Sequence, residues 1–164
     1  MSPLLLFKYL LSVSMATILT KFPSLQPAAT KPLLGLYFAA SWCPDCSGTT
    51  PLVGELAAAN TDSLAVVYVA SDHTPEQMSS YVPKSLAFVP FEKEQERADL
   101  KRHFGACGFK ELAALGMTGA DRKHGLPTLI ILDPATDNII TTDGVNALSG
   151  SEKDSAVSGW LKQL

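Results

Sequence analysis

The sequence contains few cysteines and no long run of charge of either sign. Its 164 residues include 3 Cys, which are too few for the disulfide framework that stabilises small secreted domains. The net charge is −3, and the sequence lacks the basic patch that marks nucleic-acid binding, so we expect no nucleic-acid partner. Hydrophobic residues make up 46% of the chain and charged residues 18%, a composition typical of a globular domain with a buried core.

The chain also lacks a clear membrane-spanning segment. Residues 1–20 are rich in apolar side chains, but Lys8 interrupts them, and a membrane-spanning helix needs about 20 consecutive apolar residues. We interpret residues 1–32 as an amphipathic N-terminal element that packs on a domain formed by residues 33–164, in a cytoplasmic protein. The alternative is secretory or organellar targeting by residues 1–29, with Lys8 as the positive flank of a leader peptide.

Short apolar runs alternate with helical patterns along the rest of the chain. The apolar runs predict four strands: Leu33–Ala40, Leu64–Ala70, Thr128–Leu132 and Asn138–Thr142. The other segments predict helices at 49–60, Thr74–Val82, Phe91–Phe104 and Lys110–Leu115 and a last helix from Ser151. Asp72, which follows the second predicted strand, is interpreted as a helix cap. This order predicts an α/β fold with a central mixed sheet of about four to five strands flanked by helices.

Two of the cysteines form a C-x-x-C motif directly after the first predicted strand, within the stretch SWCPDC. Cys43 is expected in the first turn of the following helix, where unpaired N–H groups and the helix dipole favour thiolate over thiol. Cys46 lies nearly one helical turn further on, so its sulfur can reach that of Cys43. Pro44 is tolerated at a helix start. Such a pair can close a disulfide and exchange it with another disulfide.

The stretch LYFAASWCPDC and the later GLPT resemble the thioredoxin superfamily, and within it the tryparedoxin and nucleoredoxin branch, whose pattern is YFSASWCPPC. The resemblance extends over about Leu33 to Val145. It implies a thioredoxin-like fold in which Cys43 is the attacking thiolate and Cys46 the resolving thiol. The implied reaction is dithiol–disulfide exchange with protein substrates, and an external dithiol or reductase would supply the electrons. The resemblance implies neither an organic cofactor nor a metal, and we expect a monomer.

The same resemblance assigns roles to the residues around the pair. It implies that Pro127 is a cis-proline facing the disulfide and that the backbone of Leu126 pairs with a bound substrate strand. Trp42 would flank the active-site surface and help to position the substrate, while Pro44 and Asp45 would tune the motif. Because the carboxylate of Asp45 opposes a thiolate beside it, we expect a less oxidising pair than the helix dipole alone would give.

Three features depart from the family pattern. Tyr37 stands where thioredoxins proper carry a buried aspartate, as in the tryparedoxin branch, and we interpret it as a packing residue. The motif contains Pro-Asp instead of Pro-Pro or Gly-Pro. The segment 105–125 is longer than its tryparedoxin equivalent and is expected to change the substrate surface. Within it, Asp121–His124 is interpreted as a solvated turn, with a basic lip that steers acidic partners as the alternative.

Two other functions are compatible with the cysteines. A zinc-binding module would use the set Cys43, Cys46, His103 and Cys107, whose local spacings are acceptable. The two half-sites are nevertheless far apart in sequence, and we expect no metal. The other alternative is a non-catalytic thioredoxin-like module that only binds partners, although such a module has no need of two intact cysteines.

Overall fold

The computed structural model describes residues 17–164; residues 1–16, which contain Lys8 and half of the predicted N-terminal element, lie outside the described part. A mixed sheet of five strands has the order β3–β2–β1–β4–β5. The strands are β1 Leu33–Ala39, β2 Leu64–Ala70, β3 Ala87–Phe88, β4 Thr128–Leu132 and β5 Ile139–Thr141. β1 is parallel to β2 and β2 to β3, whereas β4 is antiparallel to both of its neighbours. The predicted α/β fold with a central mixed sheet is therefore confirmed.

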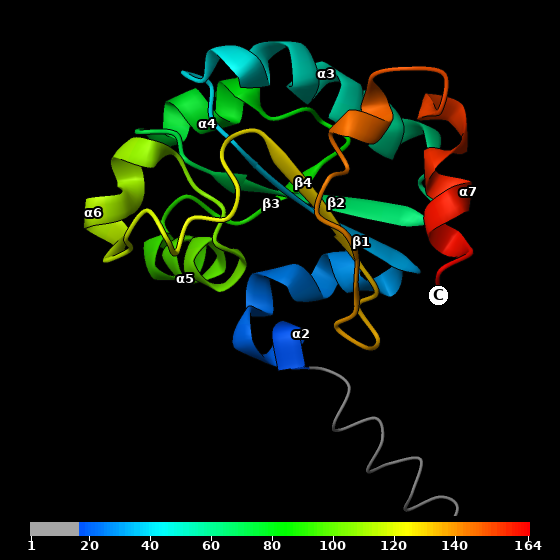
Figure 1. The fold of residues 1–164 in the computed structure, drawn as a ribbon, viewed down its shortest axis with the longest axis horizontal. Helices are drawn as coiled ribbons and strands as arrows, with labels where there is room; N and C mark the ends of the chain where they lie inside the picture. Colours follow the sequence, from blue (N-terminus) through cyan, green and yellow to red (C-terminus); the bar gives the residue numbers. More distant parts are fainter. Residues whose placement is uncertain (1–16) are drawn as a thin grey trace, which may run out of the picture.

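Helices cover both faces of this sheet (Figure 1). They are α2 Thr17–Lys21, α3 Pro44–Ala59, α4 Pro75–Tyr81, α5 Glu94–Phe104, α6 Leu112–Leu115 and α7 Ala156–Leu161, with a longer 3₁₀ helix at Pro23–Thr30. Side chains of β1 alternate between the two faces. Tyr37 belongs to a buried cluster with residues of α3, α4 and α7, whereas Leu36 and Phe38 belong to a second cluster with α5 and the 3₁₀ helix. All of β1 is buried, which explains its almost continuous apolar sequence.

Several element boundaries differ from the predictions. The helix whose apolar pattern covers 49–60 begins at Pro44 and ends at Ala59, so the C-x-x-C motif opens it, as expected from the position predicted for Cys43. The charged helix α5 begins at Glu94 instead of Phe91, and it ends as predicted because Gly105 takes a left-handed conformation with φ 63°. The last α-helix begins at Ala156, after a short 3₁₀ turn, instead of at Ser151. The two-residue strand β3 was not predicted.

The described part of the N-terminal element packs against the sheet face that α5 also covers. Phe22 and Leu25 are fully buried there. The N–H and the hydroxyl of Ser24 both donate to the carboxylate of Glu96, each at 2.7 Å. The division into residues 1–32 and 33–164 stays a prediction. No helix within residues 17–164 is long and apolar enough to cross a bilayer.

Candidate redox site

The two cysteines lie where β1 ends and α3 begins. Cys43 is the N-cap of α3, one position before the predicted first turn, and Pro44 follows it as the first helical residue. Cys43 is 6% exposed and Cys46 is fully buried, and both are free thiols. The N–H of Cys46 donates to the Cys43 carbonyl at 3.1 Å. The helix therefore holds the two thiols one turn apart and leaves Cys43 as the more accessible of the two.

The environment of Cys46 favours its thiol form. Burial raises the pKa of Cys46 well above its usual range, and the neighbouring Cys43 raises that pKa further, while a backbone hydrogen bond at Ala40 lowers it. The carboxylate of Asp45 adds a smaller increase. Since a thiol is a poor nucleophile, Cys46 is suited to act second, after a disulfide has formed at Cys43.

The loop that precedes β4 faces the cysteines. The Leu126–Pro127 peptide bond is cis, as predicted. The carbonyl oxygen of Leu126 lies 3.9 Å from the sulfur of Cys43, and the hydroxyl of Thr128 fixes the loop by donating to the Gly125 carbonyl at 2.7 Å. These contacts place Leu126 beside the more accessible thiol. The part that Leu126 and Pro127 play in positioning a substrate stays a prediction.

Trp42 lies on the surface next to Cys43. Its side chain is 41% exposed, its Nε1–H donates to the Ser71 carbonyl at 2.8 Å, and its ring stacks on His73 with 5.6 Å between the ring centroids. The indole is thus held in place by its polar edge while one face remains open. This position agrees with the predicted location of Trp42, and its role in substrate positioning stays a prediction.

Asp72 accepts a hydrogen bond from the backbone just before the C-x-x-C motif and is not a helix cap. Thr74 caps α4 instead, because its hydroxyl accepts the Gln77 N–H. The two carboxylate oxygens of Asp72 accept hydrogen bonds from the Ser41 N–H at 2.7 Å and from the Tyr68 hydroxyl at 2.8 Å. The interpretation of Asp72 as a cap was therefore wrong. The sequence alone does not show that the end of β1 lies beside Asp72. The observed contacts fix the residue that precedes Trp42.

A chain of hydroxyl groups occupies the region where thioredoxins proper have a buried acid. Tyr37 is fully buried, and its hydroxyl lies 2.8 Å from that of Thr50, which is 2.8 Å from the hydroxyl of Tyr81. Thr50 is one helical turn after Cys46, and all three side chains lie in or against the cluster that contains Cys46. Burial raises the pKa of Tyr37, and negative charge on Cys46 would raise it further, so this chain is neutral.

If Tyr37 is a packing residue, Tyr37→Phe should remove one buried hydrogen bond and little else. We expect the free energy of unfolding to fall by about 0.5–1.5 kcal/mol, as measured by urea denaturation. The rate of disulfide exchange and its pH dependence should be unchanged. A slower closure of the Cys43–Cys46 disulfide with a shifted pH profile would instead show that the hydroxyl chain transfers a proton to or from Cys46.

The residues of the zinc alternative do not converge. His103, on α5, lies with its Nδ1 3.3 Å from the ammonium of Lys21 and with its ring against Phe22. Cys107 is buried in a separate small cluster under α6. In the part of the chain described, residues 17–164, no group of three or more His, Cys, Asp or Glu side chains could hold a metal ion.

A cleft of about 480 Å³ opens beside Cys43. Its lining consists of Trp42, Cys43, His73, Gly108, Phe109, Lys110, Glu111, Arg122 and Leu126. Segment 105–125 supplies five of these residues. That this segment changes the substrate surface relative to tryparedoxins stays a prediction. No sequence motif points to His73 or to Gly108–Glu111, because only the fold brings these residues to Cys43.

Comparison with known proteins agrees with this geometry. Residues 32–138 match the protein family described as thioredoxin-like. The chain belongs to the thioredoxin-like family. Tryparedoxin II from Crithidia fasciculata superimposes on this thioredoxin-like protein with a TM-score of 0.57 and 28% identity, over 77% of this chain and 73% of the other. A thioredoxin from Wuchereria bancrofti gives the same TM-score and identity over 86% and 88% of the two chains.

Curated relatives of this thioredoxin-like protein are nucleoredoxins. Human nucleoredoxin-like protein 1 is 30% identical over 127 residues, which are 71% of this chain and 51% of the relative. Mouse nucleoredoxin is 29% identical over 116 residues, 68% of this chain and 22% of the relative. The chain thus spans about half of the first relative and about a fifth of the second. These relationships support a redox function for the Cys43–Cys46 pair and place the protein in the predicted tryparedoxin and nucleoredoxin branch.

Proposed function

We propose that this protein is a protein-disulfide oxidoreductase that exchanges the Cys43–Cys46 dithiol or disulfide with protein substrates. The observation that carries the proposal is the pairing of an N-cap thiol with a fully buried thiol one turn later. The carbonyl of Leu126 beside Cys43 supports it, since a backbone group there is available to a bound segment. A module that only binds partners would not need this arrangement of two thiols.

In the proposed reaction, the Cys43 thiolate attacks one sulfur of a substrate disulfide. A Cys43–substrate disulfide forms, and the second substrate sulfur leaves as a thiolate that takes up a proton. Cys46 then loses its proton and attacks the Cys43 sulfur, which closes the Cys43–Cys46 disulfide and releases the first substrate sulfur as a thiol. Two electrons and two protons pass from the pair to the substrate. An external dithiol or reductase restores the pair, and no further cofactor takes part.

The test is catalysis of insulin disulfide reduction with dithiothreitol as the electron donor. Catalysis above the rate of dithiothreitol alone is expected, and the reduction potential of the pair can be obtained by equilibration with glutathione buffers. Reduction is expected to need no added metal and to survive treatment with a chelator. A protein with an intact pair that gives no acceleration with any disulfide substrate would favour the non-catalytic binding module.

Asp45→Asn should make the Cys43–Cys46 disulfide more oxidising. The carboxylate of Asp45 opposes a thiolate at the neighbouring Cys43, so its removal stabilises the thiolate form of the reduced pair. We expect the reduction potential to rise by about 5–20 mV, because an exposed charge contributes about 0.2–1 kcal/mol and about 30 mV corresponds to about 1.4 kcal/mol. Asp62→Asn, beyond the far end of α3, is the matched control. An equal rise in both variants would mean that net charge, not proximity to the motif, sets the change.

A further inference from the structure

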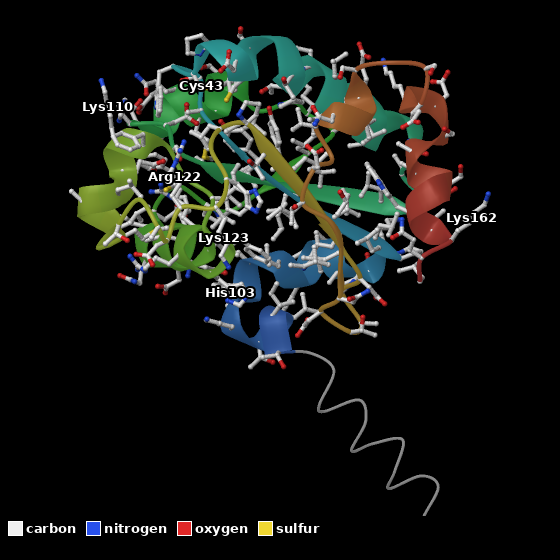
Figure 2. The ribbon with its side chains drawn as sticks, in the orientation of Figure 1. Cys43, His103, Lys110, Arg122, Lys123 and Lys162 are labelled. Atoms are coloured by element: carbon white, nitrogen blue, oxygen red, sulfur yellow. The ribbon has the colours of Figure 1, made fainter. Side chains whose placement is uncertain are left out.

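The wall of the cleft beside Cys43 carries two cationic side chains, Lys110 and Arg122. Lys110 is exposed and Arg122 is partly exposed, and both line the cleft. Neither is a member of an ion pair in the part of the chain that the structure describes. Figure 2 shows both on the same side of the molecule as Cys43, while Lys162 lies at the other end.

The one carboxylate in the cleft lining is already occupied. Glu111 pairs with the buried ammonium of Lys101 at 2.6 Å, and its second oxygen accepts the Gly108 N–H at 2.6 Å and the Ser71 hydroxyl at 2.8 Å. Its charge is therefore compensated within the wall. The net positive charge of the cleft comes from Lys110 and Arg122, although the whole chain has a net charge of −3.

Arg122 is held in a position from which it can bind a second group. Its Nε–H donates to the Cys107 carbonyl at 2.9 Å, and its guanidinium lies against the backbone at Gly125, where a Cβ would come within 2.7 Å of one terminal nitrogen. The guanidinium centre is 5.9 Å from the centre of the Phe109 ring. Because Nε is the atom that donates to the Cys107 carbonyl, the fork of terminal N–H groups can still donate to a carboxylate of a bound segment.

Apolar surface accompanies these charges. Phe109 is 71% exposed and Trp42 is 41% exposed, and both line the cleft. Exposed aromatic side chains of this size are common anchors in binding surfaces. Their position beside Cys43 suits a peptide segment that extends from a cysteine and places an apolar side chain between the rings.

We propose that this cleft selects disulfide substrates in which acidic residues flank the reacting cysteine, and that Lys110 and Arg122 provide the selectivity. The occupant is an extended protein segment with a disulfide at Cys43 and carboxylates near Lys110 and Arg122. This proposal rests on the disulfide exchange proposed above and adds the substrate class. In this proposal Arg122 belongs to the substrate surface, so it adopts the alternative interpretation of Asp121–His124, a basic lip that steers acidic partners.

The experiment uses three peptides that differ only in charge. Each carries one cysteine in a mixed disulfide with 2-mercaptoethanol, and the two residues on either side of the cysteine are all Glu, all Gln or all Lys. The reduced protein is mixed with each peptide, and the second-order rate constant of peptide thiol release is measured at low salt. We expect the Glu peptide to react about 2- to 10-fold faster than the Lys peptide, and the ratio to approach one at about 1 M salt.

Variants that change one charge test whether the selectivity between the Glu and Lys peptides arises in the cleft. Lys110→Glu should reduce the Glu-to-Lys rate ratio by about 2- to 5-fold, and Arg122→Gln should reduce it similarly. Lys162→Glu makes the same charge change as Lys110→Glu just after the end of α7, at the other end of the molecule from Cys43, and should leave the ratio unchanged (Figure 2). Arg122 also donates to the Cys107 carbonyl, so Arg122→Gln could prevent folding. In that case the result for Lys110→Glu alone tests the proposal.

The outcomes separate this proposal from the function on which it rests. Equal rates for the three peptides, or an equal loss of selectivity in Lys110→Glu and Lys162→Glu, would overturn the selectivity and leave disulfide exchange intact. No reaction with any peptide, in a protein whose thiols are shown to be reduced, would overturn disulfide exchange itself and the selectivity with it.

Discussion

Replacing Cys43 by serine is expected to abolish disulfide reduction, whereas replacing Cys46 by serine is expected to trap a mixed disulfide with the substrate. The difference follows from the positions of the two thiols, because Cys43 caps α3 beside the cleft and Cys46 is fully buried. In a protein without Cys43 the two remaining thiols, Cys46 and Cys107, are both fully buried. A protein without Cys46 can attack a disulfide but has no second thiol to release the product.

The measurement combines insulin reduction with non-reducing gel electrophoresis and mass spectrometry of the adduct. Cys107→Ala is the matched control, because Cys107 is buried in another cluster and burial raises its pKa. This variant should reduce insulin at the parent rate and trap nothing. If Cys43→Ser traps substrate while Cys46→Ser does not, the roles of the two thiols are reversed. If removal of Cys107 also stops turnover, a third thiol takes part.

The sequence predicts the core of this fold well because the buried strands have strong patterns. β1, β2 and β4 are apolar almost throughout, which is typical of strands covered on both faces. β3 consists of two exposed residues, Ala87 and Phe88, and neither alternation nor length distinguishes it from a loop. A hydrophobic pattern reveals which residues are buried. An exposed edge strand of two residues has no buried face and therefore no such pattern.

The candidate site divides in the same way. Cys43 and Cys46 can be found from a local motif, because their chemistry depends on their spacing, and Pro127 can be found from the resemblance of GLPT to the thioredoxin superfamily. The residues that form the walls of the cleft cannot be predicted in this way. His73 and Gly108–Glu111 lie beside Cys43 because the fold brings together segments that are far apart in sequence. Backbone hydrogen bonds from Cys107 and His124 close the segment 105–125 on itself, and this closure has no periodic signature in the sequence.

Glu111→Ala is expected to destabilise the fold by about 3 kcal/mol. The variant leaves the ammonium of Lys101 buried without a partner, and breaking a buried ion pair typically costs about 3–5 kcal/mol. The lower end of this range applies because Glu111 is 21% exposed, compared with 5% for Lys101, so water can reach the site. The Gly108 N–H and the Ser71 hydroxyl also lose their acceptor, which loosens the wall of the cleft.

Urea denaturation followed by circular dichroism measures this loss. Glu55→Ala is the matched control, because Glu55 pairs with Lys153 at 3.0 Å but is 62% exposed, and exposed pairs contribute about 0–1 kcal/mol. Adding Lys101→Met to Glu111→Ala should restore part of the stability, since it removes the unpaired charge and keeps most of the apolar contact. A loss in Glu111→Ala no larger than in Glu55→Ala would mean that Lys101 reaches water once Glu111 is gone.

The pH dependence of the same loss identifies its cause. Burial lowers the pKa of Lys101 and the charge of Glu111 raises it, so removal of Glu111 lowers this pKa further in the folded protein. When the folded pKa of a lysine is below its unfolded value, the unfolded chain binds more protons between the two values, and stability rises with pH there. The destabilisation by Glu111→Ala should therefore be largest below the folded pKa of Lys101 and shrink as the pH rises toward the unfolded value. A loss that stays constant over this range would come from the hydrogen bonds of Gly108 and Ser71 instead of from the buried charge.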